Sequence, residues 1–66
     1  MSLSDYDAAH IGEILTNERF GSWYSCRLLR ALDSLLPYAD DDNMRRLILA
    51  FPEECGALLA HYNTPS

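Results

Sequence analysis

The sequence predicts an all-α fold, a compact bundle of four short helices that forms a single domain of 66 residues. Apolar residues recur at three- and four-residue spacing in four successive segments, as they do in helices that bury one face. No segment shows the two-residue alternation that is typical of a half-buried strand. Apolar stripes on four short segments indicate packing around one shared core. We expect these helices near residues 5–17, 22–36, 42–51 and 52–62.

The first helix is expected to begin at Ser4, because Ser4 and Asp7 form a serine-x-x-acid pattern that satisfies free amides at a helix start. Asn17 and Gly21 bracket its expected end, and Phe20 is expected to fold back onto the core. The buried face of this helix is expected to carry Ala8, Ile11, Ile14 and Leu15.

The second helix has the strongest apolar pattern and is expected to begin near Ser22. We expect Arg27, Arg30 and Asp33 to face solvent on the opposite side. Pro37 should end this helix, because the residue before a proline avoids helical geometry. The apolar stripe consists of Trp23, Cys26, Leu28, Leu29, Leu32, Leu35 and Leu36.

The third helix should follow a cluster of residues that favour helix caps, Asp40, Asp41, Asp42 and Asn43. On this helix Asp41 with Arg45, and Asp42 with Arg46, have the spacing of weak ion pairs. Its expected apolar face comprises Met44, Leu47, Ile48 and Phe51.

The fourth helix is expected to start at Pro52, since a proline in the first helical position loses no hydrogen bond. Gly56 lies within this helix, where glycine costs about 1 kcal/mol relative to alanine, and is expected to mark a close helix crossing. The apolar face comprises Cys55, Leu58, Leu59 and Tyr62.

The formal charge of -5 comes from ten carboxylates and five cationic side chains. This charge repels phosphate, which argues against nucleic acid and anionic membranes as partners. It favours a basic or neutral protein, chiefly through the rate of encounter. The sequence shows no apolar run of about 20 residues and no secretory signal, so we expect no membrane span and a cytoplasmic location. Cys26 and Cys55 are therefore expected to be reduced, buried thiols.

The sequence does not predict an enzyme. His10 and Glu13 are three residues apart, but the paired carboxylate and histidine motifs of metal-binding bundles are missing. Cys26 and Cys55 fall on apolar stripes, whereas a reactive thiol needs an electropositive, partly exposed setting. The glycines are isolated, and a bundle of this size leaves little room for a pocket of about 300 Å³ or more. We therefore expect no catalytic residues, no cofactor and no metal.

The aromatic residues indicate a surface for binding another protein, because there are more of them than four thin stripes need. Tryptophan, tyrosine and arginine contribute most of the binding energy at many protein interfaces. An alternative for Trp23 is that it caps the bundle, with its N–H bonded to a nearby carbonyl. The predicted partner-binding residues are Trp23, Tyr24, Arg27 and Tyr38.

Three segments of the chain resemble small helical proteins that are encoded by actinobacterial phages and prophages. These segments are His10-Ile-Gly-x-Ile-Leu15, Trp23-Tyr24 leading to Leu28-Leu-Arg30, and Phe51-Pro-Glu53. The use of arginine for every cationic residue agrees with such a source, because arginine has GC-rich codons. The shared residues are core and helix-break positions, so the resemblance implies a phage origin and transfers no functional residue.

We interpret the sequence as a small acidic, non-enzymatic protein-interaction module, encoded by a phage, that binds or modulates a host protein. One alternative is a role directed at nucleic acid, either as a weak DNA binder through Arg45 and Arg46 or as a DNA mimic. Another alternative is a structural piece that assembles with itself, for example as a homodimer. The carboxylates of a DNA mimic would include Asp33, Asp40, Asp41 and Asp42.

Overall fold

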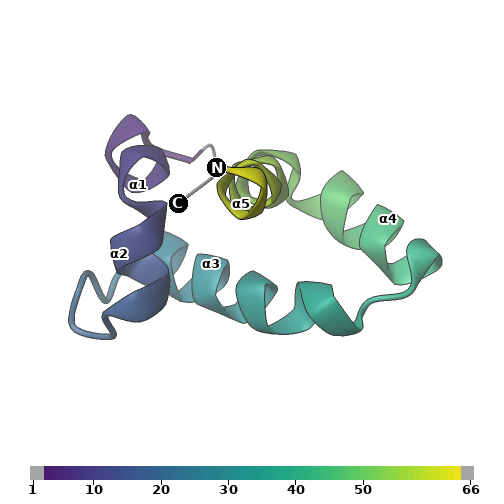
Figure 1. Cartoon of the computed structure of the whole chain (residues 1–66), viewed down its shortest axis with the longest axis horizontal. Helices are drawn as coiled ribbons and strands as arrows, with labels where there is room; N and C mark the ends of the chain where they lie inside the picture. Colours follow the sequence, from purple (N-terminus) through teal and green to yellow (C-terminus); the bar gives the residue numbers. More distant parts are fainter. Residues whose placement is uncertain (1–2, 65–66) are drawn as a thin grey trace.

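The computed structural model describes residues 3–64, and this part of the chain is all-α and contains no strand (Figure 1). The predicted fold class is therefore confirmed. None of the described helices is long and apolar enough to cross a membrane. The elements are α1 (Asp5–Ala9), α2 (Ile11–Thr16), α3 (Tyr24–Leu35), the 3₁₀ turn η1 (Leu36–Tyr38), α4 (Asp41–Ala50) and α5 (Pro52–Asn63).

Helices α2, α3 and α5 pack against one another and enclose the core, while α4 packs mainly against α5. In Figure 1, α1 and α2 stand at one end of α3, and α4 lies toward the other end. No side chain of α4 is fully buried. The buried hydrophobic residues are Ile11, Ile14, Cys26, Leu29, Leu32, Leu36, Cys55 and Leu58, all of which the sequence pattern predicted.

Three predicted helix boundaries rest on local chemistry that the structure confirms. Ser4 Oγ accepts a hydrogen bond from the Asp7 amide at 3.1 Å and caps α1. Asp40 Oδ1 accepts one from the Asn43 amide at 2.8 Å and caps α4. Pro52 occupies the first turn of α5, directly after the break at Phe51. These short-range signals act within three or four residues, which is why the sequence reveals them.

The predicted helix over residues 5–17 is wrong in one respect, because the chain breaks at His10 into α1 and α2. In a continuous helix the His10 amide would donate to the Tyr6 carbonyl four residues earlier. Here the His10 ring Nδ1 lies 2.7 Å from that carbonyl, and the His10 amide donates instead to Asp7 at 3.1 Å. The ring thus takes the place of the amide at the Tyr6 carbonyl, and the backbone turns at His10.

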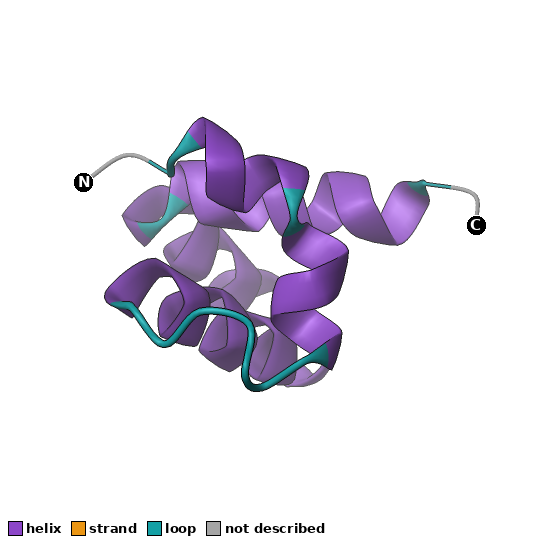
Figure 2. Cartoon of the chain, turned by 90° about the vertical axis from the view of Figure 1, so that its left-hand side faces the viewer, coloured by secondary structure: helices purple, strands orange, loops and turns teal. Residues whose placement is uncertain are grey.

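Arg30 was expected to face solvent, and this expectation is wrong. Its guanidinium reaches the end of α2 and the loop of residues 17–23, which crosses the face shown in Figure 2. The loop carbonyls point at one cation and gain charge-assisted hydrogen bonds from it. The five carbonyls, at 2.7 to 3.3 Å, belong to Ile14, Asn17, Glu18, Phe20 and Gly21.

Gly21 lets this loop turn tightly beside α3. Its φ of +67° lies in the left-handed region, which favours glycine. A Cβ atom at this position would lie 2.7 Å from Cys26 Sγ and 2.7 Å from the Trp23 ring. Gly21 is therefore required both by the backbone conformation and by the space available.

Four other expectations about side chains are wrong. Leu35 is 53% exposed and Ile48 is 37% exposed, because α4 does not lie along α3 and leaves part of both stripes uncovered. Gly56 has open space where a Cβ would stand, so it marks no close crossing. Tyr62, expected on the apolar face of the last helix, is 44% exposed, and its hydroxyl donates a hydrogen bond to Asp33 at 2.6 Å.

The predicted ion pairs on α4 also differ in register. Arg45 Nη1 lies 4.0 Å from Asp42 Oδ1, three residues away, and both side chains are largely exposed. Among the described residues, the two pairs expected at four-residue spacing do not form. Such exposed pairs contribute little to stability in either register.

Candidate interaction surfaces

Trp23 and Asp7 form a polar contact that joins the start of α3 to α1. The Trp23 indole N–H lies 3.2 Å from each carboxylate oxygen of Asp7. Asp7 is almost fully buried, and the Cys26 thiol lies 4.0 Å from its Oδ1. This arrangement agrees with the alternative that Trp23 caps the bundle, with a carboxylate rather than a carbonyl as the acceptor. The ring is still 47% exposed.

The four predicted partner-binding residues lie at two ends of α3. Trp23, Tyr24 and Arg27 lie at its N-terminal end, where Arg27 Nε donates to the Ser22 carbonyl at 3.0 Å. Tyr38 lies in η1, beyond the C-terminal end. A helix of 12 residues is about 18 Å long, so the structure does not bring the four together. Tyr24 and Tyr38 also line different surface hollows.

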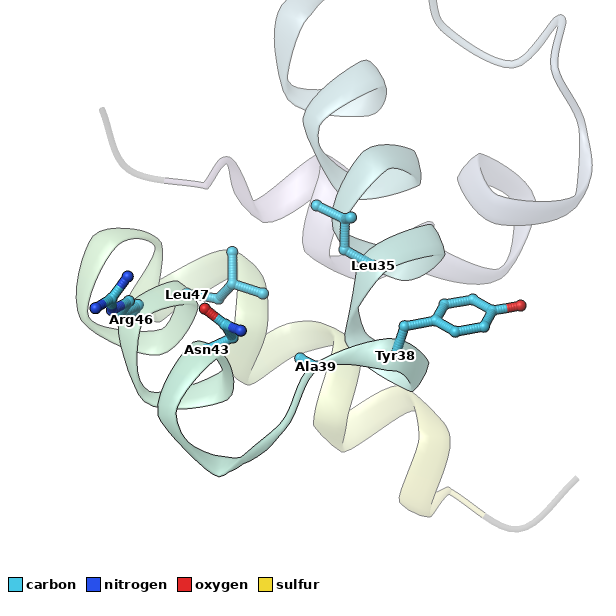
Figure 3. A pocket seen from close by; sticks show the side chains of 6 residues that line it. All are labelled: Leu35, Tyr38, Ala39, Asn43, Arg46 and Leu47. Atoms are coloured by element: carbon cyan, nitrogen blue, oxygen red, sulfur yellow. The ribbon is translucent and has the colours of Figure 1, made fainter.

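The first hollow has a volume of about 290 Å³ and lies between the end of α3 and α4 (Figure 3). In this view Leu35 on α3 and Leu47 on α4 come from opposite sides, Asn43 lies next to Leu47, and Ala39 lies on the segment that connects the two helices. Tyr38 and Arg46 extend outward in opposite directions. We call Leu35, Tyr38, Ala39 and Leu47, the apolar residues that line this hollow, the α3–α4 surface.

The α3–α4 surface is apolar and open. Leu35 is 53% exposed and Tyr38 is 89% exposed, while Leu29 on α3 is completely buried. The 3₁₀ turn and Ala39 separate α4 from α3, and α4 then packs mainly on α5. Sequence reasoning missed Leu35 and Leu47 because helical spacing does not tell a stripe that faces the core from one that faces a partner.

Two further hollows lie between helices. One has a volume of about 470 Å³ and is formed by the start of α3 and the joint between α4 and α5. The other, of about 340 Å³, is lined mostly by small residues of α1, α2 and α5, together with His61. The expectation that this chain has little room for pockets of such size is wrong, because the hollows open at the surface and do not require space inside the bundle.

The two thiols do not provide a reactive centre. Both are free and buried, as predicted. Burial, and next the negative charge of Asp7, raises the pKa of the Cys26 thiol. Burial, and next the charge of Glu54, raises the pKa of the Cys55 thiol. Raised pKa values keep both sulfurs in the weakly nucleophilic thiol form at neutral pH.

Comparison with protein-family models, curated proteins and solved structures finds no match for this chain. The functional argument therefore depends on the surfaces. Within residues 3–64, no three histidine, cysteine or acidic side chains gather as they would around a metal ion. The arrangement that stands out chemically is an open apolar hollow beside a row of carboxylates.

Proposed function

We propose that this chain is a phage-encoded protein-interaction module that binds a host protein through the α3–α4 surface. The observation that carries the proposal is the exposure of Leu35 and Tyr38 around one hollow. Apolar area left in water costs about 25 cal/mol per Å² relative to burial, so covering it contributes directly to binding. Contiguous apolar surface surrounded by polar residues is typical of protein interaction sites.

The partner that fits this surface is a basic protein with an apolar side chain for the hollow. The acidic residues 40–42 lie between Ala39 and Asn43, two residues that line the hollow. Arg46 at its edge offers a guanidinium fork to a carbonyl or carboxylate of the partner. Two copies of this chain would each carry a charge of -5 and repel one another, which favours a different protein over a homodimer.

The contacts of the arginines also favour a protein partner over DNA. Arg27 and Arg30 donate to carbonyls of their own chain, and Arg45 lies beside Asp42. Arg27 and Arg30 are therefore used within the chain, and Arg45 has an acidic neighbour, whereas phosphate binding needs a free basic face. A host protein in the cytoplasm is the partner class that we propose.

Affinity capture from an actinobacterial host extract tests the proposal, followed by titration of the purified captured protein. The wild type is compared with a Leu35→Ser, Tyr38→Ser double variant. Leu49→Ser is the matched control, because Leu49 is 76% exposed on α4 but does not line the hollow. We expect one stoichiometric host protein with the wild type and the control, and its loss with the double variant.

Circular dichroism establishes that each variant is folded, which is expected because the substituted side chains are exposed. Equal binding by the double variant and the wild type would contradict the proposed surface. Light scattering adds a second readout. A dimeric wild type that the double variant converts to a monomer would identify a second copy of the chain as the occupant, and would overturn the proposal of a host partner.

A further inference from the structure

The hollow of about 470 Å³ combines aromatic walls with carboxylates and contains no basic side chain. Its walls come from the start of α3, through Tyr24 and Leu28, and from Ala50, Phe51 and Pro52 at the joint between α4 and α5. Glu53 and Glu54, in the first turn of α5, complete the lining. A site with this composition attracts a cation and repels an anion.

Glu54 is the residue that makes this hollow unusual. The residue is only 7% exposed and its carboxylate has no hydrogen-bond donor among the residues that the structure describes, but its oxygens still reach solvent, because no side-chain oxygen of these residues is both buried and unpaired. Neighbouring Glu53 is exposed and accepts a hydrogen bond from the Leu3 amide at 3.2 Å. The positive end of α5 compensates part of the Glu54 charge. This carboxylate is therefore open to a cation that enters the hollow, and a guanidinium there would gain a charge-assisted hydrogen bond.

We infer that this hollow is a socket for an arginine side chain of the partner protein. A guanidinium donates two parallel N–H groups to a carboxylate, which satisfies both oxygens of Glu54 at once. Its flat face also stacks on aromatic rings, and Tyr24 and Phe51 supply such rings in the lining. A lysine ammonium makes neither the fork nor the stack, so the socket should prefer arginine.

This inference deepens the proposed function. It rests on that proposal in one respect, namely that the arginine belongs to a partner protein. The socket and the α3–α4 surface share no lining residue. Helix α4 contributes to both, through Asn43, Arg46 and Leu47 on one side and Ala50 on the other. One basic partner segment that crosses α4 would therefore place an apolar side chain in the first hollow and an arginine in the second.

Nuclear magnetic resonance titration of the ¹⁵N-labelled protein tests the socket with three short peptides as probes. The probes are acetyl-Gly-Arg-Gly-amide, the same peptide with lysine, and the same peptide with citrulline, which keeps the shape of arginine without its charge. We expect the arginine peptide to shift the amides of Tyr24, Leu28 and residues 51–54. The lysine and citrulline peptides should bind about tenfold more weakly or not measurably.

Two variants and a control locate the interaction. Glu54→Gln should weaken binding of the arginine peptide by about tenfold or more, because it removes a charge-assisted hydrogen bond. Tyr24→Leu should weaken it by about threefold, through loss of the stacking face. Glu18→Gln makes the same chemical change at an exposed carboxylate outside the socket and should leave binding unchanged.

Three results would overturn the inference. These are equal binding of the arginine and citrulline peptides, equal binding of the arginine and lysine peptides, or shifts confined to the acidic residues 40–42. The peptide comparison uses the wild type, so it does not depend on the folding of any variant. A protein that still captures its partner through the α3–α4 surface while ignoring the arginine peptide would retain the proposed function and lose the socket.

Discussion

The start of α3 and the region around α4 carry similar apolar stripes, but the structure uses them differently. Around the start of α3, Arg30 donates to four loop carbonyls and to the Ile14 carbonyl of α2, and Trp23 bonds to the buried Asp7. These contacts connect residues 9 to 16 positions apart in the sequence. Helix α4, by contrast, has no fully buried side chain and is attached through partly buried residues such as Met44 and Phe51.

The difference shows that the two regions contribute unequally to the stability of the fold. The N-terminal region fixes the loop and the end of the bundle with hydrogen bonds that require specific partners. The α4 region leaves apolar side chains uncovered, which costs stability in the free protein and, in our proposal, provides the surface that binds a partner. Substitutions that make the same chemical change in both regions should therefore have unequal effects.

The largest difference is expected for the same truncation at two leucines. Leu29→Ala should lower the free energy of unfolding by about 2–5 kcal/mol, because Leu29 is fully buried. Leu49→Ala, at a residue that is 76% exposed, should change it by no more than about 0.5 kcal/mol. Urea unfolding followed by circular dichroism measures both. Similar losses for the two variants would show that α4 is packed as firmly as the core.

A second pair of variants compares two arginines. Arg30→Gln should destabilise the protein by about 2–3 kcal/mol, since several carbonyls lose their charged donor. Arg45→Gln should cost less than about 0.5 kcal/mol, because its pair with Asp42 is exposed. Thermal unfolding is the measurement. If Arg30→Gln melted at the wild-type temperature, the guanidinium would not hold the loop.

A pair of glycine substitutions should have effects of opposite sign. Gly21→Ala should destabilise by about 2 kcal/mol, because it strains a positive φ and forces a Cβ against Cys26 and Trp23. Gly56→Ala should stabilise α5 by up to about 1 kcal/mol, since the new methyl group meets open space. Unfolding in urea compares the two, and a stabilised Gly21→Ala variant would contradict the described loop.

The smallest expected effect concerns alkaline pH at Tyr62. Partial burial, followed by the hydrogen bond to Asp33, raises the pKa of this hydroxyl well above its usual range. The unfolded chain therefore loses the proton first, and this contribution to stability is present below about pH 10 and declines as pH rises further. Tyr62→Phe should reduce the decline, as measured by urea unfolding across this range. An unchanged profile would show that Tyr62 does not contribute.

The sequence predicts those features that depend on nearby residues. The caps at Ser4 and Asp40 and the break before Pro52 are local, and the eight buried residues follow from helical spacing. The bridge from Arg30 to the loop was not predictable in this way, because it depends on how the chain folds back over α3. The break at His10 is accompanied by a contact between its ring and the Tyr6 carbonyl, which helical spacing does not reveal.

The candidate surface was only partly predictable for the same reason. The number of aromatic residues in the sequence predicted binding roles for Tyr38 and Tyr24. Tyr38 is 89% exposed beside the first hollow, and Tyr24 lines the proposed socket. Leu35 and Leu47 became candidates only once the direction of α4 was known. Trp23 was expected either to bind a partner or to cap the bundle, and its N–H is bonded to Asp7 within the chain.

The measurement that tests this account most directly is a calorimetric titration of the captured host protein against two variants, together with their melting temperatures. We expect Leu35→Ser to weaken binding at least about tenfold while melting within a few degrees of the wild type. Trp23→Phe removes the indole N–H from Asp7, so it should lower the melting temperature and leave the affinity unchanged. The reverse pattern, with affinity lost at Trp23 and kept at Leu35, would contradict the assignment of binding to the α3–α4 surface.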